Sequence, residues 1–133
     1  PLNLTIICPE DFKPDIDLYN KVKQQGLSNV EINHNPFDGI KNSDVVYTDV
    51  WASMGQKEEA DKRRKIFQDY QVNTNMMSNA NSDAIFMHCL PAERGVEVTD
   101  NVCDSSNSVI FDQAENRMHA QNAIILKLMD IDI

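Results

Sequence analysis

The stretch Ala84-Ile85-Phe86-Met87-His88-Cys89-Leu90-Pro91 decides the fold that this sequence predicts. Its four leading apolar residues are typical of a short buried strand, and the proline that follows cannot continue a helix or donate to a sheet. The strand therefore ends on a histidine and a thiol. In open α/β sheets, ligands bind in the crevice beyond the carboxyl ends of the strands. We expect this strand end to form part of a functional edge.

Strand patterns alternate with helical patterns on both sides of this run, which is typical of an α/β fold with a parallel sheet. The predicted strands are residues 4–8, 30–32, 44–48, 84–87 and 109–111. Helices are predicted after a cap at Asp15 and before a stop at Gly26, briefly at 37–40, at 56–68 and at 112–129. In the last of these, apolar residues recur on one face, so we expect Met118 and Met129 to fill the core.

Length and charge exclude several classes of protein. The 133 residues suffice for one domain with its own core. A formal net charge of −9 leaves no basic patch for phosphates, so nucleic acid is a poor candidate partner. The longest apolar run, residues 123–126, is far shorter than the ~18 residues of a membrane span, so we predict no membrane segment.

The three cysteines are odd in number and lack C-x-x-C spacing, so neither a disulfide framework nor a zinc ribbon is expected. A reducing intracellular compartment fits best. The three histidines show no paired metal-ligand spacing either, and we expect no metal and no cofactor.

Three chemically useful side chains follow predicted strand ends: Asp49, Cys89 and Arg117. Because the ends of parallel strands face the same way, the sheet would bring an acid, a thiol and a guanidinium to one edge. Each also has an ordinary explanation. Asp49 could cap a turn, Cys89 could be a small buried hydrophobe, and Arg117 could be a plain helix residue. Their combination favours a catalytic site.

Three segments carry a resemblance to a known family. They are His88-Cys89-Leu90-Pro91, Asp49-Val50-Trp51-Ala52-Ser53-Met54-Gly55 and Asp112-Gln113-Ala114-Glu115-Asn116-Arg117-Met118-His119. Together they resemble the ornithine-binding domain of ornithine carbamoyltransferases, over nearly the whole chain. The aspartate-specific relatives look like His-Pro-Leu-Pro at the first segment. The resemblance implies a Rossmann-like parallel sheet with flanking helices.

The resemblance also implies a reaction, in which the side-chain amine of ornithine attacks the carbonyl carbon of carbamoyl phosphate to give citrulline and phosphate. An alkyl amine has a pKa near ~10, so it arrives protonated and is not yet a nucleophile. The role carried over to Asp49 and Cys89 is to hold this cation and help remove its proton.

Four further residues take roles from the same resemblance. Ser53 and Met54 would grip the amino-acid end of ornithine, and the carbonyl of Leu90 would bind the carbamoyl amide. Arg117 would support the carbamoyl oxygen, where positive charge stabilises the oxyanion that develops during attack. The resemblance also predicts a cis peptide bond between Leu90 and Pro91.

Some parts of the family pattern do not occur in this sequence. The Ser-x-Arg-Thr-Arg phosphate loop and the His-Pro-x-Gln segment of the carbamoyl phosphate domain are missing, as is the Gly-Asp-Gly-x-Asn turn. We therefore expect residues 1–133 to form a partial ornithine-binding domain, truncated at its amino end and lacking its first, central strand. Strands 4–8 and 84–88 would then face a gap in the sheet.

As it stands, such a chain should hold half a site and transfer no carbamoyl group alone. The resemblance implies a homotrimer for the full-length enzyme, in a mitochondrion, a plastid or a bacterial cytoplasm. Two alternatives stay open. A carbamoyltransferase for a related amine such as putrescine is disfavoured by Ser53 and Met54, because a diamine lacks the carboxylate end. A non-catalytic binding or interaction module is favoured by the missing phosphate loop but not by the intact set of Asp49, Cys89 and Arg117.

Overall fold

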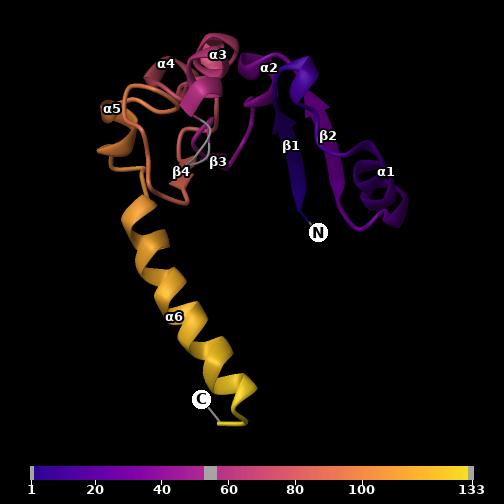
Figure 1. Cartoon of the computed structure of the whole chain (residues 1–133), viewed down its shortest axis with the longest axis vertical. Coiled ribbons are helices and arrows are strands. Elements are labelled where there is room, and N and C mark those ends of the chain that lie inside the picture. The colour runs from indigo at the N-terminus through magenta and orange to yellow at the C-terminus, as the bar shows by residue number, and fades with distance from the viewer. Residues whose placement is uncertain (1, 53–56, 132–133) are drawn as a thin grey trace.

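The computed structural model describes residues 2–52 and 57–131. It confirms the predicted α/β class, with short parallel strands and flanking helices (Figure 1). In chain order the elements are β1 (Asn3–Ile7), η1 (Glu10–Phe12), α1 (Ile16–Gln25), β2 (Asn29–Asn33), α2 (Pro36–Gly39), β3 (Val45–Thr48), α3 (Lys57–Phe67), η2 (Gln68–Tyr70), α4 (Thr74–Met77), β4 (Ile85–His88), α5 (Asp100–Cys103) and α6 (Ile110–Leu128).

The strands form two separate parallel pairs, β1 with β2 and β3 with β4. In the first pair Leu4 lies opposite Val30, and in the second Thr48 lies opposite His88. Figure 1 shows the β1–β2 pair with α1 as one lobe and the β3–β4 pair, surrounded by α3, α4 and α5, as another. The sheet was predicted to be interrupted in its middle. The structure shows an interruption, because the two strand pairs, all of whose residues are described, are not hydrogen-bonded to each other.

The interruption lies between β1 and β3. A cavity of about 380 Å³ separates them, lined by residues 2–5 and Ile7 on one side and by residues 44–47 on the other. We expected residues 84–88 to face this gap, and that was wrong. The far edge of β4 is occupied by the segment before α6, since Phe86 N–H donates to the Asn107 carbonyl at 2.9 Å and its carbonyl accepts from Val109 N–H at 3.0 Å.

The predicted fifth strand at residues 109–111 is also wrong. Beside β4 this segment makes a single parallel bridge, between Phe86 and Ser108. Val109 is then the N-cap of α6, and the Gln113 N–H donates to its carbonyl at 2.8 Å. A short apolar run such as residues 109–111 can form a strand or the start of a helix. Here Ile110 is buried from the first turn of α6.

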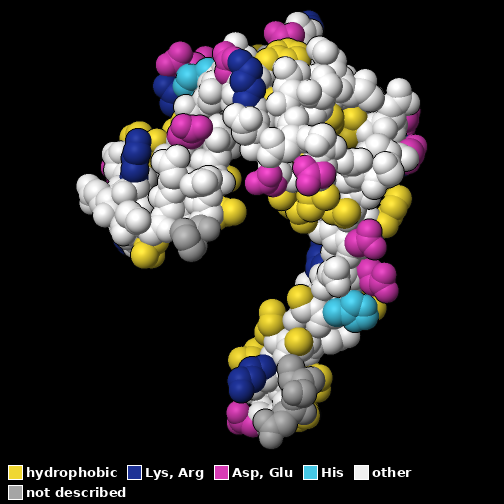
Figure 2. Space-filling view, turned by 180° about the vertical axis from the view of Figure 1, so that it is seen from behind, with side chains coloured by type: hydrophobic (Ala, Val, Ile, Leu, Met, Phe, Trp, Pro, Cys, Tyr) yellow, Lys and Arg dark blue, Asp and Glu magenta, His cyan; other side chains and the backbone are white. Residues whose placement is uncertain are grey.

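The core lies between residues 40 and 110, where Phe86 and Val98 are fully buried and Ile40 and Ile110 are nearly so. In contrast, α6 projects away from both lobes (Figure 1). The expectation that Met118 and Met129 fill the core was wrong, since they are 53% and 63% exposed. Figure 2 shows hydrophobic side chains along the projecting helix, near its end.

The end signals of α1 are confirmed. The Asp15 carboxylate accepts a hydrogen bond from the Leu18 N–H at 2.8 Å, and Gly26 follows the helix with a left-handed φ of 63°. Within the part of the chain that the structure describes, no helix combines the length and the apolar character needed to cross a bilayer.

Candidate active site

The carboxyl ends of β3 and β4 bring an acid and a thiol together. Because Thr48 and His88 are opposite each other in the parallel register, the next residues, Asp49 and Cys89, emerge side by side. A carboxylate oxygen of Asp49, a ring nitrogen of His88 and Sγ of Cys89 lie within 4.8 Å of one another. Asp49 is exposed, Cys89 is half-buried and His88 is fully buried.

The surroundings of Cys89 favour its neutral thiol. Burial raises the pKa of the Cys89 thiol, and the adjacent Asp49 carboxylate raises it further, while a hydrogen bond with Tyr47 acts in the opposite direction. Burial also raises the pKa of Tyr47. The site therefore favours the neutral Cys89 thiol beside the Asp49 carboxylate.

Gln113 connects this strand edge to α6. Its side-chain oxygen accepts a hydrogen bond from the His88 N–H at 3.1 Å, and its Nε2 donates to the Tyr47 hydroxyl at 3.2 Å. Sequence reasoning missed both Gln113 and Tyr47. Their positions carried a signal, since Tyr47 shares a strand face with Asp49 and Gln113 precedes Arg117 by one helical turn.

Arg117 does not join the acid and the thiol in this structure. It is exposed on α6, about 6 Å along the helix axis from Gln113. It makes no hydrogen bond or ion pair with another residue of the described ranges 2–52 and 57–131. The first turn of α6 is therefore fixed at the strand edge, and Arg117 extends from the next turn.

Of the two predicted substrate-binding segments, the structure describes the one at Leu90 but not the one at Ser53 and Met54. The Leu90–Pro91 peptide bond is cis, as predicted. Leu90 has a left-handed φ of 56°, and its N–H donates to Nδ1 of His88 at 2.9 Å. The predictions for Ser53 and Met54 lie outside the described residues.

The residues around Cys89 offer three possible ligand atoms for a metal, but His88 is already occupied. Its Nδ1 accepts the Leu90 N–H, and its Nε2 lies 3.3 Å from the Glu97 carboxylate. A metal bound to Asp49, His88 and Cys89 would have to replace one of these contacts. The donor set is thus arranged for protein contacts.

A cavity of about 330 Å³ adjoins the acid. Its lining includes Asp49, Trp51, Phe67 and Tyr70 together with aliphatic side chains, so one carboxylate joins a largely apolar wall. The ring centroid of Phe67 lies 5.8 Å from that of Trp51 and 5.8 Å from that of Tyr70. Such a cavity can accept an aliphatic chain that carries an ammonium group at the end nearest Asp49.

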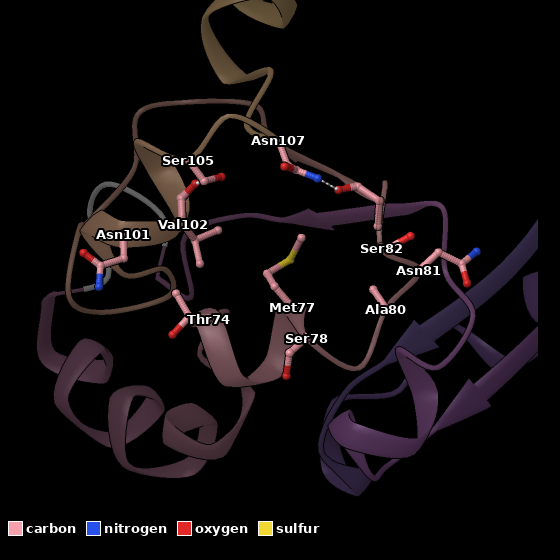
Figure 3. Close-up of a pocket in the computed structure, with 11 residues that line it drawn as sticks. Thr74, Met77, Ser78, Ala80, Asn81, Ser82, Asn101, Val102, Ser105 and Asn107 are labelled. Carbon is pink, nitrogen blue, oxygen red and sulfur yellow. Dashed lines mark hydrogen bonds between the residues drawn. The ribbon is translucent and has the colours of Figure 1, made fainter.

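A second cavity, of about 270 Å³, offers different chemistry (Figure 3). Asn101, Val102, Asn107 and Met77 line it, and a hydrogen bond joins the Asn107 side chain to the Ala84 carbonyl at 3.0 Å. Its lining residues are small, apolar or amide side chains without an acid, a base or a thiol. Proton transfer therefore favours the cavity at Asp49 as the candidate active site.

The fold and the strand-edge pair of acid and thiol define an α/β domain with a candidate site at the ends of β3 and β4. Residues 1–128 match the family model described as the aspartate/ornithine carbamoyltransferase, Asp/Orn binding domain. The chain belongs to this family of carbamoyltransferases.

Similar proteins agree with this assignment. The chloroplastic ornithine carbamoyltransferase of Pisum sativum is 54% identical over 129 residues, which are 97% of this chain and 34% of that protein. The ornithine carbamoyltransferase of Thermococcus kodakarensis is 51% identical, over 96% of this chain and 41% of the relative. The chain thus spans about a third to two fifths of the curated relatives it matches.

Solved structures show the same fold. The ornithine carbamoyltransferase of Pyrococcus furiosus superposes with a TM-score of 0.82 at 40% identity, covering 94% of this chain and 48% of that one. The anabolic ornithine carbamoyltransferase of Campylobacter jejuni gives 0.88 at 32% identity, covering 96% and 43%.

Proposed function

We propose that this chain provides the ornithine-binding half of an ornithine carbamoyltransferase site, for the formation of citrulline and phosphate from ornithine and carbamoyl phosphate. The observation that carries the proposal is the adjacency of Asp49 and Cys89 at the ends of β3 and β4, beside a cavity with an apolar wall. The proposal concerns one half of a site because the chain spans only part of the length of its relatives.

In this proposal Asp49 receives the side-chain ammonium of ornithine. The carboxylate attracts the cation, and the aliphatic chain lies along Trp51 and Phe67. A cation placed between Asp49 and Cys89 would offset the charge that now raises the pKa of the thiol. Asp49 then accepts the proton that the amine must lose before attack, and Cys89 supports the neutral amine by hydrogen bonding.

Carbamoyl phosphate would be held on the far side of the amine. The Leu90 carbonyl binds the carbamoyl amide, and Arg117 stabilises the oxyanion. Gln113 supports this arrangement by fixing the first turn of α6 at the strand edge, one turn below Arg117. Ser53 and Met54 contact the amino-acid end of ornithine.

Other properties of the whole enzyme belong to the same proposal. Its full-length form is a homotrimer, as the family resemblance implies. Its compartment is a reducing one, which is supported by the free thiols of Cys8, Cys89 and Cys103. One relative is named chloroplastic and others are archaeal, so a plastid and a prokaryotic cytoplasm both lie within the range of similar proteins.

Calorimetric titration of the chain with ornithine tests the proposal. We expect saturable binding, and we expect Asp49→Asn to weaken it about tenfold or more, because a hydrogen bond to a charged group contributes about 1.5 to 3 kcal/mol. Glu115→Gln, which removes a charge from the exposed face of α6, should bind like wild type. Equal binding of ornithine by wild type and Asp49→Asn would contradict the proposal.

Two further ligands separate the alternatives. Putrescine should bind more weakly than ornithine, since it lacks the carboxylate end, and tighter binding of putrescine would favour the enzyme for a related amine. The chain alone should form no citrulline from ornithine and carbamoyl phosphate, because its sequence lacks the phosphate loop. Ornithine binding without citrulline formation is the result that the half-site predicts, whereas binding of neither amine would favour the interaction module.

A further inference from the structure

A buried contact between a histidine and a glutamate lies beneath the loop that follows β4. The side chains of His88 and Glu97 are both fully buried, and Nε2 of the histidine is 3.3 Å from Oε1 of the glutamate. The ring N–H is not aligned well enough for a hydrogen bond, so the contact is chiefly electrostatic. A carboxylate without solvent is unfavourable unless it is paired, so its presence here requires a reason.

Each member of the pair also binds the backbone of the loop. Nδ1 of His88 accepts the Leu90 N–H at 2.9 Å, so Nδ1 carries no proton and Nε2–H is the side of the ring that faces Glu97. Oε1 of Glu97 accepts the Glu93 N–H at 2.5 Å. The two side chains therefore hold the loop at two points, one on each side of Pro91.

Glu97 is itself fixed to the body of the protein. Its backbone carbonyl accepts the Val72 N–H at 2.8 Å, and its neighbour Val98 is fully buried. Oε2 of Glu97 is buried without a hydrogen-bond partner among the described residues. The polar contacts of the Glu97 side chain are thus the Glu93 N–H and the His88 ring, and the pair joins a rigid anchor to the strand end.

The loop has a conformation that needs such support. Leu90 has a left-handed φ, which a residue with a Cβ rarely adopts, and the bond from its N–H to His88 holds it there. Cys89 lies between the two residues that this bond joins. Its position beside Asp49 and Tyr47 therefore depends on the imidazole.

We propose that His88 and Glu97 are positioning residues that hold Cys89 against Asp49 at the amine-binding site. The contact with Glu97 fixes the imidazole, the imidazole fixes Leu90, and Cys89 is held between them. This inference rests on the proposed function for its meaning, but its test measures the thiol and not the reaction, so the two can fail separately.

The readout is the rate at which iodoacetamide alkylates Cys89, followed by mass spectrometry from pH 6.5 to 10. In wild type the thiolate should form late, because burial and Asp49 raise the pKa of Cys89. The groups that face the thiol are Asp49, Tyr47 and His88. Cys8 and Cys103 are buried and serve as internal references for the integrity of the fold.

The central variant is Glu97→Gln, which keeps the size of the side chain and an oxygen for the Glu93 N–H but removes the charge that orients His88. We expect Cys89 to be alkylated about five- to tenfold faster at pH 7.5, which corresponds to a fall of almost one pKa unit. Glu115→Gln removes the same charge from an exposed position and should leave the rate unchanged. An unchanged rate in Glu97→Gln would overturn the proposal.

A second variant separates the two contacts of the imidazole. His88→Asn places a side-chain oxygen where Nδ1 accepts the Leu90 N–H but does not reach Glu97. Its Cys89 rate should lie between those of wild type and Glu97→Gln. If either variant accelerates Cys8 and Cys103 as much as Cys89, the pair supports the whole fold and is not a positioning device.

The coupling between the thiol and the acid supplies the last arm of the experiment. In the wild-type background, Asp49→Asn should lower the pKa of Cys89 and speed its alkylation. In the Glu97→Gln background the same substitution should change the rate by less than about twofold, because the thiol no longer lies against the carboxylate. Equal effects of Asp49→Asn in both backgrounds would show that Glu97 does not position Cys89, whether or not the chain binds ornithine.

Discussion

The body of the molecule between residues 40 and 110 and the long helix α6 make opposite use of their apolar residues. In the body, Phe86, Val98 and Ile110 are buried together in one core. On α6, Met118, Ile125 and others of its apolar side chains are exposed over most of its length. Both regions have the hydrophobic pattern of a packed element, so the pattern identifies which face is apolar but not whether anything covers it.

The candidate site lies where the two regions meet. Asp49 and Cys89 belong to the packed body, whereas Arg117 belongs to the projecting helix. Gln113 is the side chain that joins them, through His88 and Tyr47. The comparison teaches that the acid and thiol are held by the core of this chain, while the position of the guanidinium depends on how α6 is held.

The largest expected effect tests the core itself. Phe86→Ala should reduce the free energy of unfolding by about 3 to 5 kcal/mol, because a fully buried ring leaves a cavity. Met118→Ala on α6 should change it by less than about 0.5 kcal/mol. Urea denaturation followed by circular dichroism measures both. Similar losses for the two variants would mean that α6 is packed in solution, which would remove the contrast.

The next effect concerns the packing of α2 against β1 and β2. A Cβ on Gly39 would lie 2.8 Å from Cγ1 of Ile7 and 3.2 Å from Cβ of Asn33. Gly39→Ala should therefore destabilise the protein by about 1 to 3 kcal/mol in the same assay. Adding Ile7→Ala should recover part of that loss, because the closest atoms are removed. Strictly additive losses would show that Gly39 and Ile7 are not in contact in solution.

A smaller effect should come from the bridge between the body and the helix. Gln113→Ala removes one hydrogen-bonded partner of His88 and one of Tyr47, so we expect a loss of about 1 kcal/mol. Gln121→Ala, on an exposed part of α6, is the matched control and should be neutral. Amide hydrogen exchange of residues 110–117 should rise in the first variant and stay constant in the second. Unchanged exchange in both would rule out Gln113 as the joint.

The smallest effect is a dependence of stability on alkaline pH. Burial raises the pKa of the Cys103 thiol, so the folded state keeps a proton that the unfolded state loses near pH 8.5. Stability is therefore fully present below pH 8.5 and falls as the pH rises through the folded pKa. Thermal unfolding between pH 7.5 and 10 should show this decline. Cys103→Ala should show a shallower one, and an equal slope would assign the decline to other groups.

Sequence reasoning predicted the parts of the site that are local. The strand end at His88 and the cap at Asp15 depend on neighbouring residues, and both are present. The cis bond before Pro91, which the family resemblance implied, is present as well. The parallel register of β3 and β4 then explains why Asp49 and Cys89 lie together. The strand end and the helix cap follow from short local patterns of residues.

The features that were missed depend on distant contacts. Residues 109–111 have a strand pattern. However, the free edge of β4 is hydrogen-bonded around Ser108, through the backbone of Asn107 and Val109. Glu97 looks like any surface acid in the sequence, and only the fold places it against His88. The direction of α6 likewise depends on tertiary contacts, which its own residues do not specify.

The most direct test of the account is whether ornithine protects Cys89 from alkylation. Saturating ornithine should slow the reaction of Cys89 with iodoacetamide at pH 8.5 severalfold, because the ammonium group and its chain cover the thiol beside Asp49. Cys8 and Cys103 should react at the same rate with and without ornithine, and Asp49→Asn should lose the protection. If Cys89 reacts equally fast with and without ornithine, the amine does not bind between Asp49 and Cys89, and the proposed site is wrong.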